Sequence, residues 1–291
     1  MNYSVRHRTT YDYAEPVTVS HHAARVEPRT LPVQRRAAFE LRITPTPALR
    51  KVRTDYFGNR VCFFSIQQIH QCLQITSECV VTVTHVTRPV ASLSAPWEKV
   101  ALLFRDPVSP EMVEPYQFCF DSPLLANSPE LADYARGSFP KDTPLLVGAL
   151  DLNRRIFSDF KYDRVATTVT TPLEVVVAKR RGVCQDFAHI AIACLRSLGL
   201  AARYVSGYLR TRPLDSKERL VGADASHAWF AVYCPDLGWV DFDPTNNLLP
   251  AEDHITVAYG RDYSDVSPLC GIITGGGKHE VTVAVDVAPI S

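Results

Sequence analysis

One stretch near the middle of the chain constrains the fold most. Residues 184–198 place apolar side chains at spacings of three and four, the pattern of an α-helix that buries one face. The buried stripe comprises Phe187, Ile190, Ala191, Cys194, Leu195 and Leu198. Cations followed by Gly182 precede it and indicate that an earlier helix ends there. The sequence therefore predicts a helix that begins at or next to Cys184, with the thiol on the inward-facing stripe.

Strands are expected after this helix. Alternating apolar residues predict them at 202–209, 226–234 and 239–243. The last two are separated by Pro235-Asp236-Leu237, which is typical of a β-hairpin. A helix packed on such strands predicts an α+β fold with an antiparallel sheet.

The register of this hairpin decides which side chains can meet. If Cys234 and Gly238 close it, Asp243 falls opposite Trp229 and diagonal to His227. Alternate residues of a strand point to the same face, so an imidazole and a carboxylate can then form a hydrogen bond across the sheet.

The chain divides into three regions by composition. Residues 1–88 show the period of two that half-buried strands require, beginning with the odd positions from Tyr3 to Tyr13, and are expected to form an antiparallel β domain. Residues 89–144 hold nine of the 21 prolines and read as a connecting region. Residues 145–291 are assigned to a catalytic core.

Local signals add detail to the helical part. Ser128-Pro129 and Thr143-Pro144 are expected to mark helix starts, and Thr171 is expected to be the N-cap of a further helix, with Pro172 at its first position. Asp186 is placed to cap or orient the helix that begins near Cys184. His189 lies on the polar face of that helix and is expected to be solvated.

Charge and cysteine usage limit the classes of partner. Lys plus Arg and Asp plus Glu both total 31, so neither nucleic acid nor an acidic membrane surface is indicated as a partner. No apolar run reaches the roughly 20 residues of a membrane span, and no secretory signal is recognised. The eight cysteines include no CxxC pair, which favours reduced thiols and a cytoplasmic location. No cofactor or metal is expected.

Three residues together indicate nucleophilic catalysis. A thiol at a helix N-terminus beside an imidazole is biased toward thiolate, which attacks carbonyls. A carboxylate on the far ring nitrogen fixes the tautomer of the imidazole. We therefore predict Cys184 as nucleophile, His227 as its base and Asp243 as the orienting residue, with Asp241 as the rival third member. Taken alone, each of these residues is more often a packing or turn residue. Chance seldom places a cysteine at a helix start together with a histidine and an aspartate on adjacent strands.

Three segments resemble the core of bacterial transglutaminase-like proteins. These segments are TPLEVVVAKRRGVCQDFAHIAIACLRSLGLAARYVSGYL, SHAWFAVYCPDLGWVDFDPTNN and HITVAYGRDYSDVSPLCGI. The family's catalytic Cys, His and Asp fall on Cys184, His227 and Asp243. Residues 1–85 are similar to the β-rich domain that often precedes this core. The resemblance implies a papain-like fold, with the cysteine helix against an antiparallel sheet.

The resemblance leaves the reaction open. Trp229, Trp239 and Gln185 are candidates for substrate contact, and Gln185 stands where the animal enzymes have Trp. We favour hydrolysis of a peptide or isopeptide amide through a thioester, because no DxDxDG calcium loop occurs. The alternatives are glutamine γ-glutamyl transfer and a non-catalytic peptide-binding module. A zinc protein is a further alternative that lacks close ligand pairs.

Overall fold

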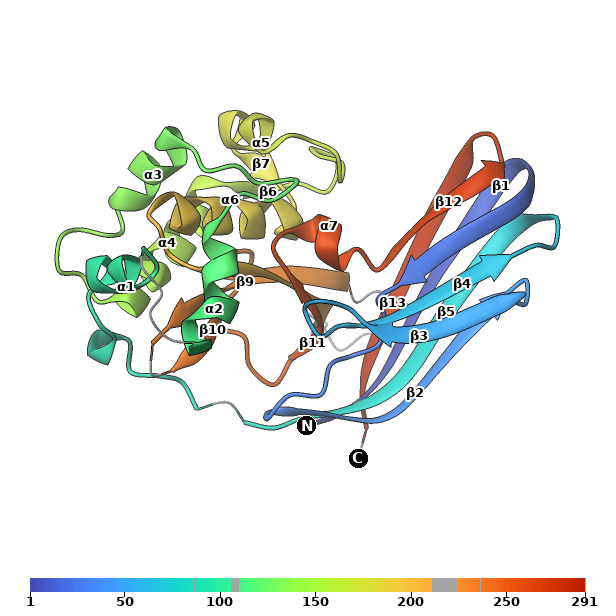
Figure 1. Cartoon of the computed structure of the whole chain (residues 1–291), viewed down its shortest axis with the longest axis horizontal. Coiled ribbons are helices and arrows are strands. Elements are labelled where there is room, and N and C mark those ends of the chain that lie inside the picture. Colours follow the sequence, from blue (N-terminus) through green and yellow to red (C-terminus); the bar gives the residue numbers. More distant parts are fainter. Residues whose placement is uncertain (86, 106–109, 211–224, 236, 291) are drawn as a thin grey trace, which may run out of the picture.

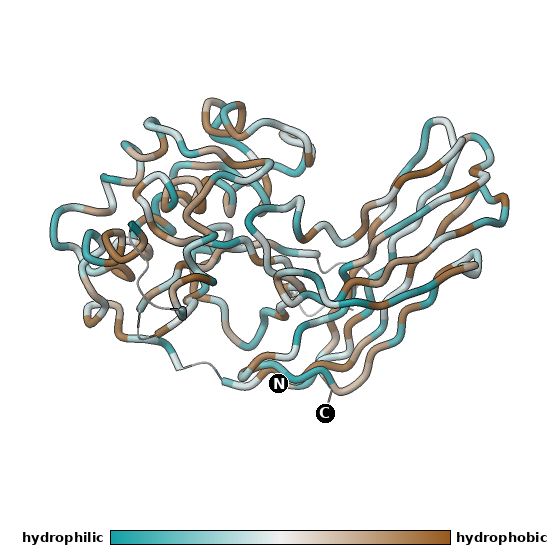
Figure 2. The backbone as a smooth tube through the Cα atoms, in the orientation of Figure 1, coloured by the Kyte–Doolittle hydropathy of each residue, from teal (hydrophilic) through white to brown (hydrophobic). Residues whose placement is uncertain are grey.

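The computed structural model describes residues 1–85, 87–105, 110–210, 225–235 and 237–290. They form a large antiparallel sheet beside a smaller sheet covered by helices (Figure 1). Hydrophobic stretches of the backbone occur in both parts (Figure 2), and each part contributes to a buried apolar cluster. Within these ranges, no helix has the length and apolar character needed to cross a membrane. The expected α+β class is confirmed.

The large sheet is built around one long strand, β1 (Asn2–Ala24). From Tyr3 to Thr9 its odd-numbered residues are buried and its even-numbered ones exposed, so the predicted period of two is present. Four further strands extend the order β2-β5-β1-β4-β3. They are β2 (Gln34–Thr44), β3 (Leu49–Thr54), β4 (Arg60–Ile66) and β5 (His70–Val83).

Two strands from the end of the chain return to this sheet. Both β12 (Leu269–Gly275) and β13 (His279–Ile290) pair antiparallel with β1, and Val287 lies opposite Val5. The sequence predicts a core of residues 145–291, but these two strands belong to the large sheet. The physical reason is burial, because Val285 and Val287 are 2% and 0% exposed and belong to the same apolar cluster as Tyr3 and Val5 of β1.

Short helices occupy the Pro-rich region and lead into the core. The helix start predicted at Ser128-Pro129 is present as α3, and the Ser128 hydroxyl caps it by accepting from the Leu131 N–H. Thr171 does not cap α5, because Pro172 takes the N-cap position and the Thr171 hydroxyl accepts from the Thr168 N–H. In the same way α4 begins after Pro144, which stands at its N-cap. The helical elements of this part are η1 (Ala91–Leu93), α1 (Trp97–Leu103), α2 (Pro110–Tyr116), η2 (Gln117–Cys119), α3 (Pro129–Arg136), α4 (Leu145–Asp159) and α5 (Leu173–Lys179).

The core sheet has the strand order β10-β9-β8-β11. Gly238 pairs with Cys234 and Asp241 with Ala231, so the hairpin register expected from the sequence is confirmed. Asp236, in the predicted hairpin loop, lies outside the described residues. The strands are β8 (Ala202–Leu209), β9 (Ala225–Cys234), β10 (Gly238–Phe242) and β11 (His254–Gly260), and a short parallel pair is formed by β6 (Lys161–Tyr162) and β7 (Arg181–Gly182).

The two faces of the core sheet have different neighbours. Helix α6 (Cys184–Ser197) packs on one face, where Phe230 and Val232 join its apolar stripe in one buried cluster. On the other face Trp229 and Tyr259 form a separate cluster that contacts Leu31 of the large sheet's part. The first part of the chain therefore reaches both faces: Leu31 contacts the Trp229 cluster, and His7 of β1 lies 2.9 Å from the Tyr208 hydroxyl on the face that carries Phe230.

Two amide side chains attach the first part of the chain to β11. The Gln34 carboxamide donates to the Thr256 carbonyl and accepts from the Thr256 N–H, both at 2.8 Å. The Asn59 carboxamide does the same with the backbone of Tyr259, again at 2.8 Å. Each amide satisfies a donor and an acceptor as a neighbouring strand would, so β11 is held on its outer edge.

Candidate active site

Cys184 is the first residue of α6 and is partly exposed. A carboxylate holds the helix start, because Asp186 accepts from the Val183 N–H at 2.8 Å and from the Thr167 hydroxyl at 2.7 Å. This fits the role expected for Asp186. Gly182 makes room for that carboxylate, since a Cβ there would lie 2.5 Å from its Oδ2. The thiol is thus fixed where the first N–H groups of the helix are unpaired.

His227 joins the thiol to a carboxylate. Its Nε2 lies 2.7 Å from Asp243 Oδ2, and Cys184 is close enough to contribute to the pKa of the imidazole. Burial lowers the pKa of His227, but the hydrogen bonds and negative charges of Asp243 and Cys184 outweigh it and raise the pKa to about 10. An imidazolium is therefore favoured at neutral pH, which suits an ion pair with a thiolate.

Asp243 is fully buried and accepts hydrogen bonds on both oxygens. Oδ2 lies 2.7 Å from Asn246 Nδ2 and 3.1 Å from His254 Nε2, in addition to His227. Oδ1 accepts from the N–H groups of Thr245 and Asn246. Burial raises the pKa of this carboxyl, but the hydrogen bonds from the two histidines and Asn246 outweigh burial and lower it. The carboxylate stays ionised and orients His227.

His254 and Asn246 were not identified from the sequence. Asn246 follows Asp243 in an Asp-Pro-Thr-Asn turn, and such turns do signal local hydrogen bonding. His254 carried no such signal, because it reaches Asp243 only through the pairing of β11 with β8. The Ala251 N–H approaches His254 Nδ1 at 3.5 Å, so Nε2 is the ring nitrogen that donates to Asp243.

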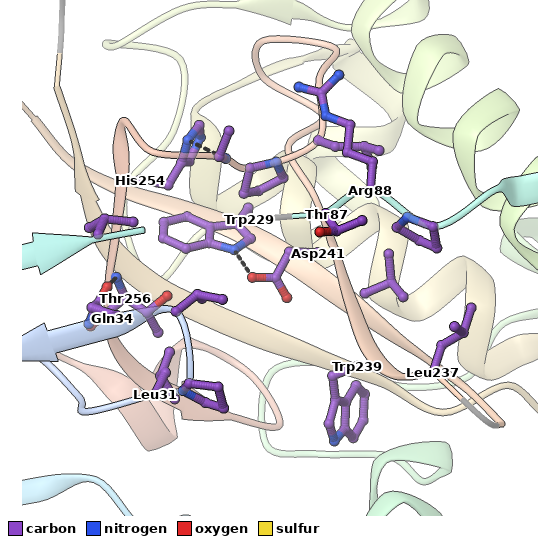
Figure 3. A pocket seen from close by; sticks show the side chains of 18 of the residues that line it. Leu31, Gln34, Thr87, Arg88, Trp229, Leu237, Trp239, Asp241, His254 and Thr256 are labelled. Carbon is purple, nitrogen blue, oxygen red and sulfur yellow. Dashed lines mark hydrogen bonds between the residues drawn. The ribbon is translucent and has the colours of Figure 1, made fainter. Parts of the chain in front are cut away.

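The structure separates Asp241 from the predicted triad. Its Oδ2 accepts from Trp229 Nε1 at 3.1 Å, while Asp243 takes the bond to His227. Trp229 and Trp239 line a cavity of about 720 Å³ (Figure 3). Cys184 is not among the described residues that line it. Gln185 is half-buried as the second residue of α6. Trp229 and Trp239 therefore line a cavity that Cys184 does not line, whereas Gln185 directly follows the thiol in α6.

The expectation for His189 was wrong. It is 5% exposed, and its Nε2 accepts from the Tyr263 N–H at 3.2 Å. Burial lowers the pKa of His189 to about 4. The polar segment after β11 forms α7 (Tyr263–Val266), and this helix covers the side of α6 that looked solvent-facing in the sequence.

One group of side chains in the described residues has the composition of a metal site. The ligand atoms of His227, Asp243 and His254 lie within 4.8 Å of one another and all three residues are buried. Two imidazoles and a carboxylate suit Zn²⁺. In that arrangement the ion would replace the hydrogen bonds that now orient His227, so it would compete with the triad geometry.

We expect His254 to act as a positioning residue. His254→Phe should lower kcat about 10- to 100-fold with little change in KM, because a hydrogen bond to a buried charge is lost. His254→Gln retains an N–H donor and should recover most of the rate. Steady-state kinetics on both variants tests this. Equal losses in the two variants would show that only the ring's packing matters.

Two family models and several relatives match this chain. Residues 3–82 match the bacterial transglutaminase-like N-terminal region, and residues 132–244 match the transglutaminase-like superfamily. An uncharacterized protein of Mycobacterium tuberculosis is 40% identical over 302 residues, covering 99% of this chain and 92% of that protein. A protein-glutamine gamma-glutamyltransferase of Pseudomonas aeruginosa is 34% identical over 73 residues, covering 24% of this chain and 11% of that protein.

A solved structure shares the fold. A protein of Cytophaga hutchinsonii described as a "Putative Cysteine Protease" superposes with a TM-score of 0.77 at 21% identity. The match covers 99% of this chain and 90% of that one. It therefore includes both the large sheet and the helix-covered sheet.

Proposed function

This chain belongs to the transglutaminase-like superfamily, and on that premise we propose that it cleaves peptide or isopeptide amides through a thioester on Cys184. One observation carries the proposal: the buried imidazole of His227 lies 2.7 Å from the Asp243 carboxylate and close enough to Cys184 at the start of α6 for the thiol to influence its pKa. That arrangement supplies a nucleophile, a proton carrier and an orienting group.

The steps follow from these positions. The Cys184 thiolate attacks the carbonyl carbon, and the N–H groups of the first turn of α6 stabilise the oxyanion. The C–N bond breaks as the His227 imidazolium gives its proton to the leaving amine. Water then attacks the thioester while the neutral imidazole takes its proton, which releases the acid and restores the thiolate and imidazolium.

Hydrolysis is the outcome we favour, with amine transfer as the second candidate. Water needs no binding site for a second substrate, whereas transfer needs one for an amine. Transfer gains support from the segment that is 34% identical to a protein-glutamine gamma-glutamyltransferase. A non-catalytic peptide-binding module is less favoured, because peptide binding alone does not require a buried ionised carboxylate, that of Asp243, bonded to His227. We also propose that the enzyme is cytoplasmic, because its eight cysteines include no CxxC pair. The balanced formal charge favours peptides as partners over nucleic acid or a membrane surface.

Product partition separates the two reactions. The enzyme is given a cleavable peptide with a millimolar excess of a primary amine, and free acid and amine adduct are measured by mass spectrometry. We expect the acid to predominate, with neither product from Cys184→Ala. A clear majority of adduct would identify transfer as the native reaction.

Thiol labelling tests the nucleophile independently of any substrate. We expect iodoacetamide near neutral pH to modify Cys184 first, because it combines a helix N-terminus with an imidazole partner. Cys72 and Cys270 are more exposed and serve as internal controls. Peptide mapping at short times gives the order, and faster labelling of Cys270 would contradict the assignment.

A further inference from the structure

The cavity of about 720 Å³ lies on the face of the core sheet that α6 leaves free. Figure 3 shows Trp229, Asp241 and Trp239 around it, with Leu31 and Gln34 contributed by the first part of the chain. Most of the remaining lining is apolar. It includes Pro32, Val33, Leu237, Val240, Leu249 and Pro250. This is the composition of a site for a small molecule with an apolar body and a few polar contacts.

Arg203 is the unusual member of the lining. It is 8% exposed, and among the described residues its guanidinium makes no hydrogen bond and no ion pair. The guanidinium carbon lies 3.6 Å from the ring centroid of Tyr259 and 4.2 Å from that of Trp239. The aromatic rings stabilise the positive charge through their faces, but they leave the in-plane N–H donors unused. A buried cation with unused donors is matched by an anion with two acceptor oxygens.

The Asp241 carboxylate lines the same cavity from β10, which is separated from the strand of Arg203, β8, by β9. Arg203 and Asp241 both pair with Ala231, from β8 and β10, so the small alanine lies between them. Asp241 Oδ2 is occupied by Trp229 Nε1, and no ion pair joins Asp241 to Arg203. The two charged groups line one cavity and attract each other through space without direct contact, which leaves room for a ligand that contacts both.

We infer that this cavity binds an α-carboxylate whose neighbouring carbon carries an N–H donor and an apolar side chain. The carboxylate lies on the Arg203 guanidinium, the N–H donates to Asp241, and the apolar side chain contacts the Leu and Val wall. A free amino acid and the C-terminal residue of a peptide share this chemistry. The site is separate from the thiol, because Cys184 does not line the cavity.

Calorimetry on the full chain with Cys184→Ala tests the site without turnover, so its result is independent of the proposed reaction. The probes are N-acetyl-L-leucine, L-leucine and the matched amide N-acetyl-L-leucinamide. We expect one site, at which a carboxylate probe binds at least about 10-fold more tightly than the amide, because a charge-assisted pair is lost. Tighter binding of N-acetyl-L-leucine identifies a peptide end, and tighter binding of L-leucine a free amino acid.

Variants locate the contact. Arg203→Gln should reduce the affinity of the carboxylate probe to that of the amide, and Arg203→Lys should keep part of it. Arg88→Gln, at the exposed mouth of the cavity, is the matched control and should bind like the parent protein. If Arg203→Gln fails to fold, the difference between acid and amide still decides. Equal affinity for acid and amide, or loss in Arg88→Gln with none in Arg203→Gln, overturns the inference.

Discussion

Replacing His227 with alanine should lower kcat by about 10⁴- to 10⁶-fold, the loss that follows removal of a residue from a cooperating triad. The side chain links the thiol to Asp243, so its loss removes the proton carrier and the cation that stabilises a thiolate. Kinetics on a peptide cleaved by the wild-type protein gives the ratio. Free imidazole added to the variant should restore part of the rate, since the truncation leaves space beside Asp243.

His22→Ala is the matched control for this variant. His22 is also buried, at 7% exposed, and stacks on Phe64 in the large sheet. Both changes remove a buried imidazole and should lower stability, but only His227→Ala should abolish turnover. A His227→Ala protein that keeps kcat within about tenfold of wild type would show that another group carries the proton.

The sequence was sufficient for the parts of the fold that depend on local patterns. The i, i+3, i+4 stripe placed the start of α6 at Cys184, and the turn after Cys234 set the hairpin register. The pairing of β13 with β1 joins residues from opposite ends of the chain, and local periodicity contains no information on partner choice. The burial of His189 was missed for the same reason, since α7 covers it from a distant segment.

The position of His254 shows how distant parts of the chain complete the site. His254 begins β11, and this strand is held by β8 on one side and by the carboxamides of Gln34 and Asn59 on the other. Because those amides belong to the first part of the chain, that part helps to fix the imidazole that donates to Asp243. Gln34 and Asn59 are distant in sequence from β11, so the sequence pattern could not reveal that they hold the strand that carries His254.

Asp243→Asn should lower kcat by about 10⁴-fold, while Asp241→Asn should change it less than about tenfold. Three donors converge on Asp243 Oδ2, from His227, His254 and Asn246. An asparagine side chain has only one acceptor oxygen. The backbone N–H groups of Thr245 and Asn246, which now donate to Oδ1, would compete for it with the three donors at Oδ2. If the new amide donates to His227 Nε2, the ring proton moves to Nδ1, and the imidazole can no longer accept the thiol proton.

Asp241→Asn is a close control because it makes the same chemical change two residues earlier in the sequence, within β10. An asparagine there still offers an oxygen to Trp229 Nε1, so local packing is preserved. Thermal unfolding of both variants separates loss of fold from loss of rate. Should Asp241→Asn show the large loss and Asp243→Asn the small one, Asp241 would be the residue that orients His227. That outcome would require the register between β9 and β10 to be shifted by two residues, and the pairing of Gly238 with Cys234 contradicts such a shift.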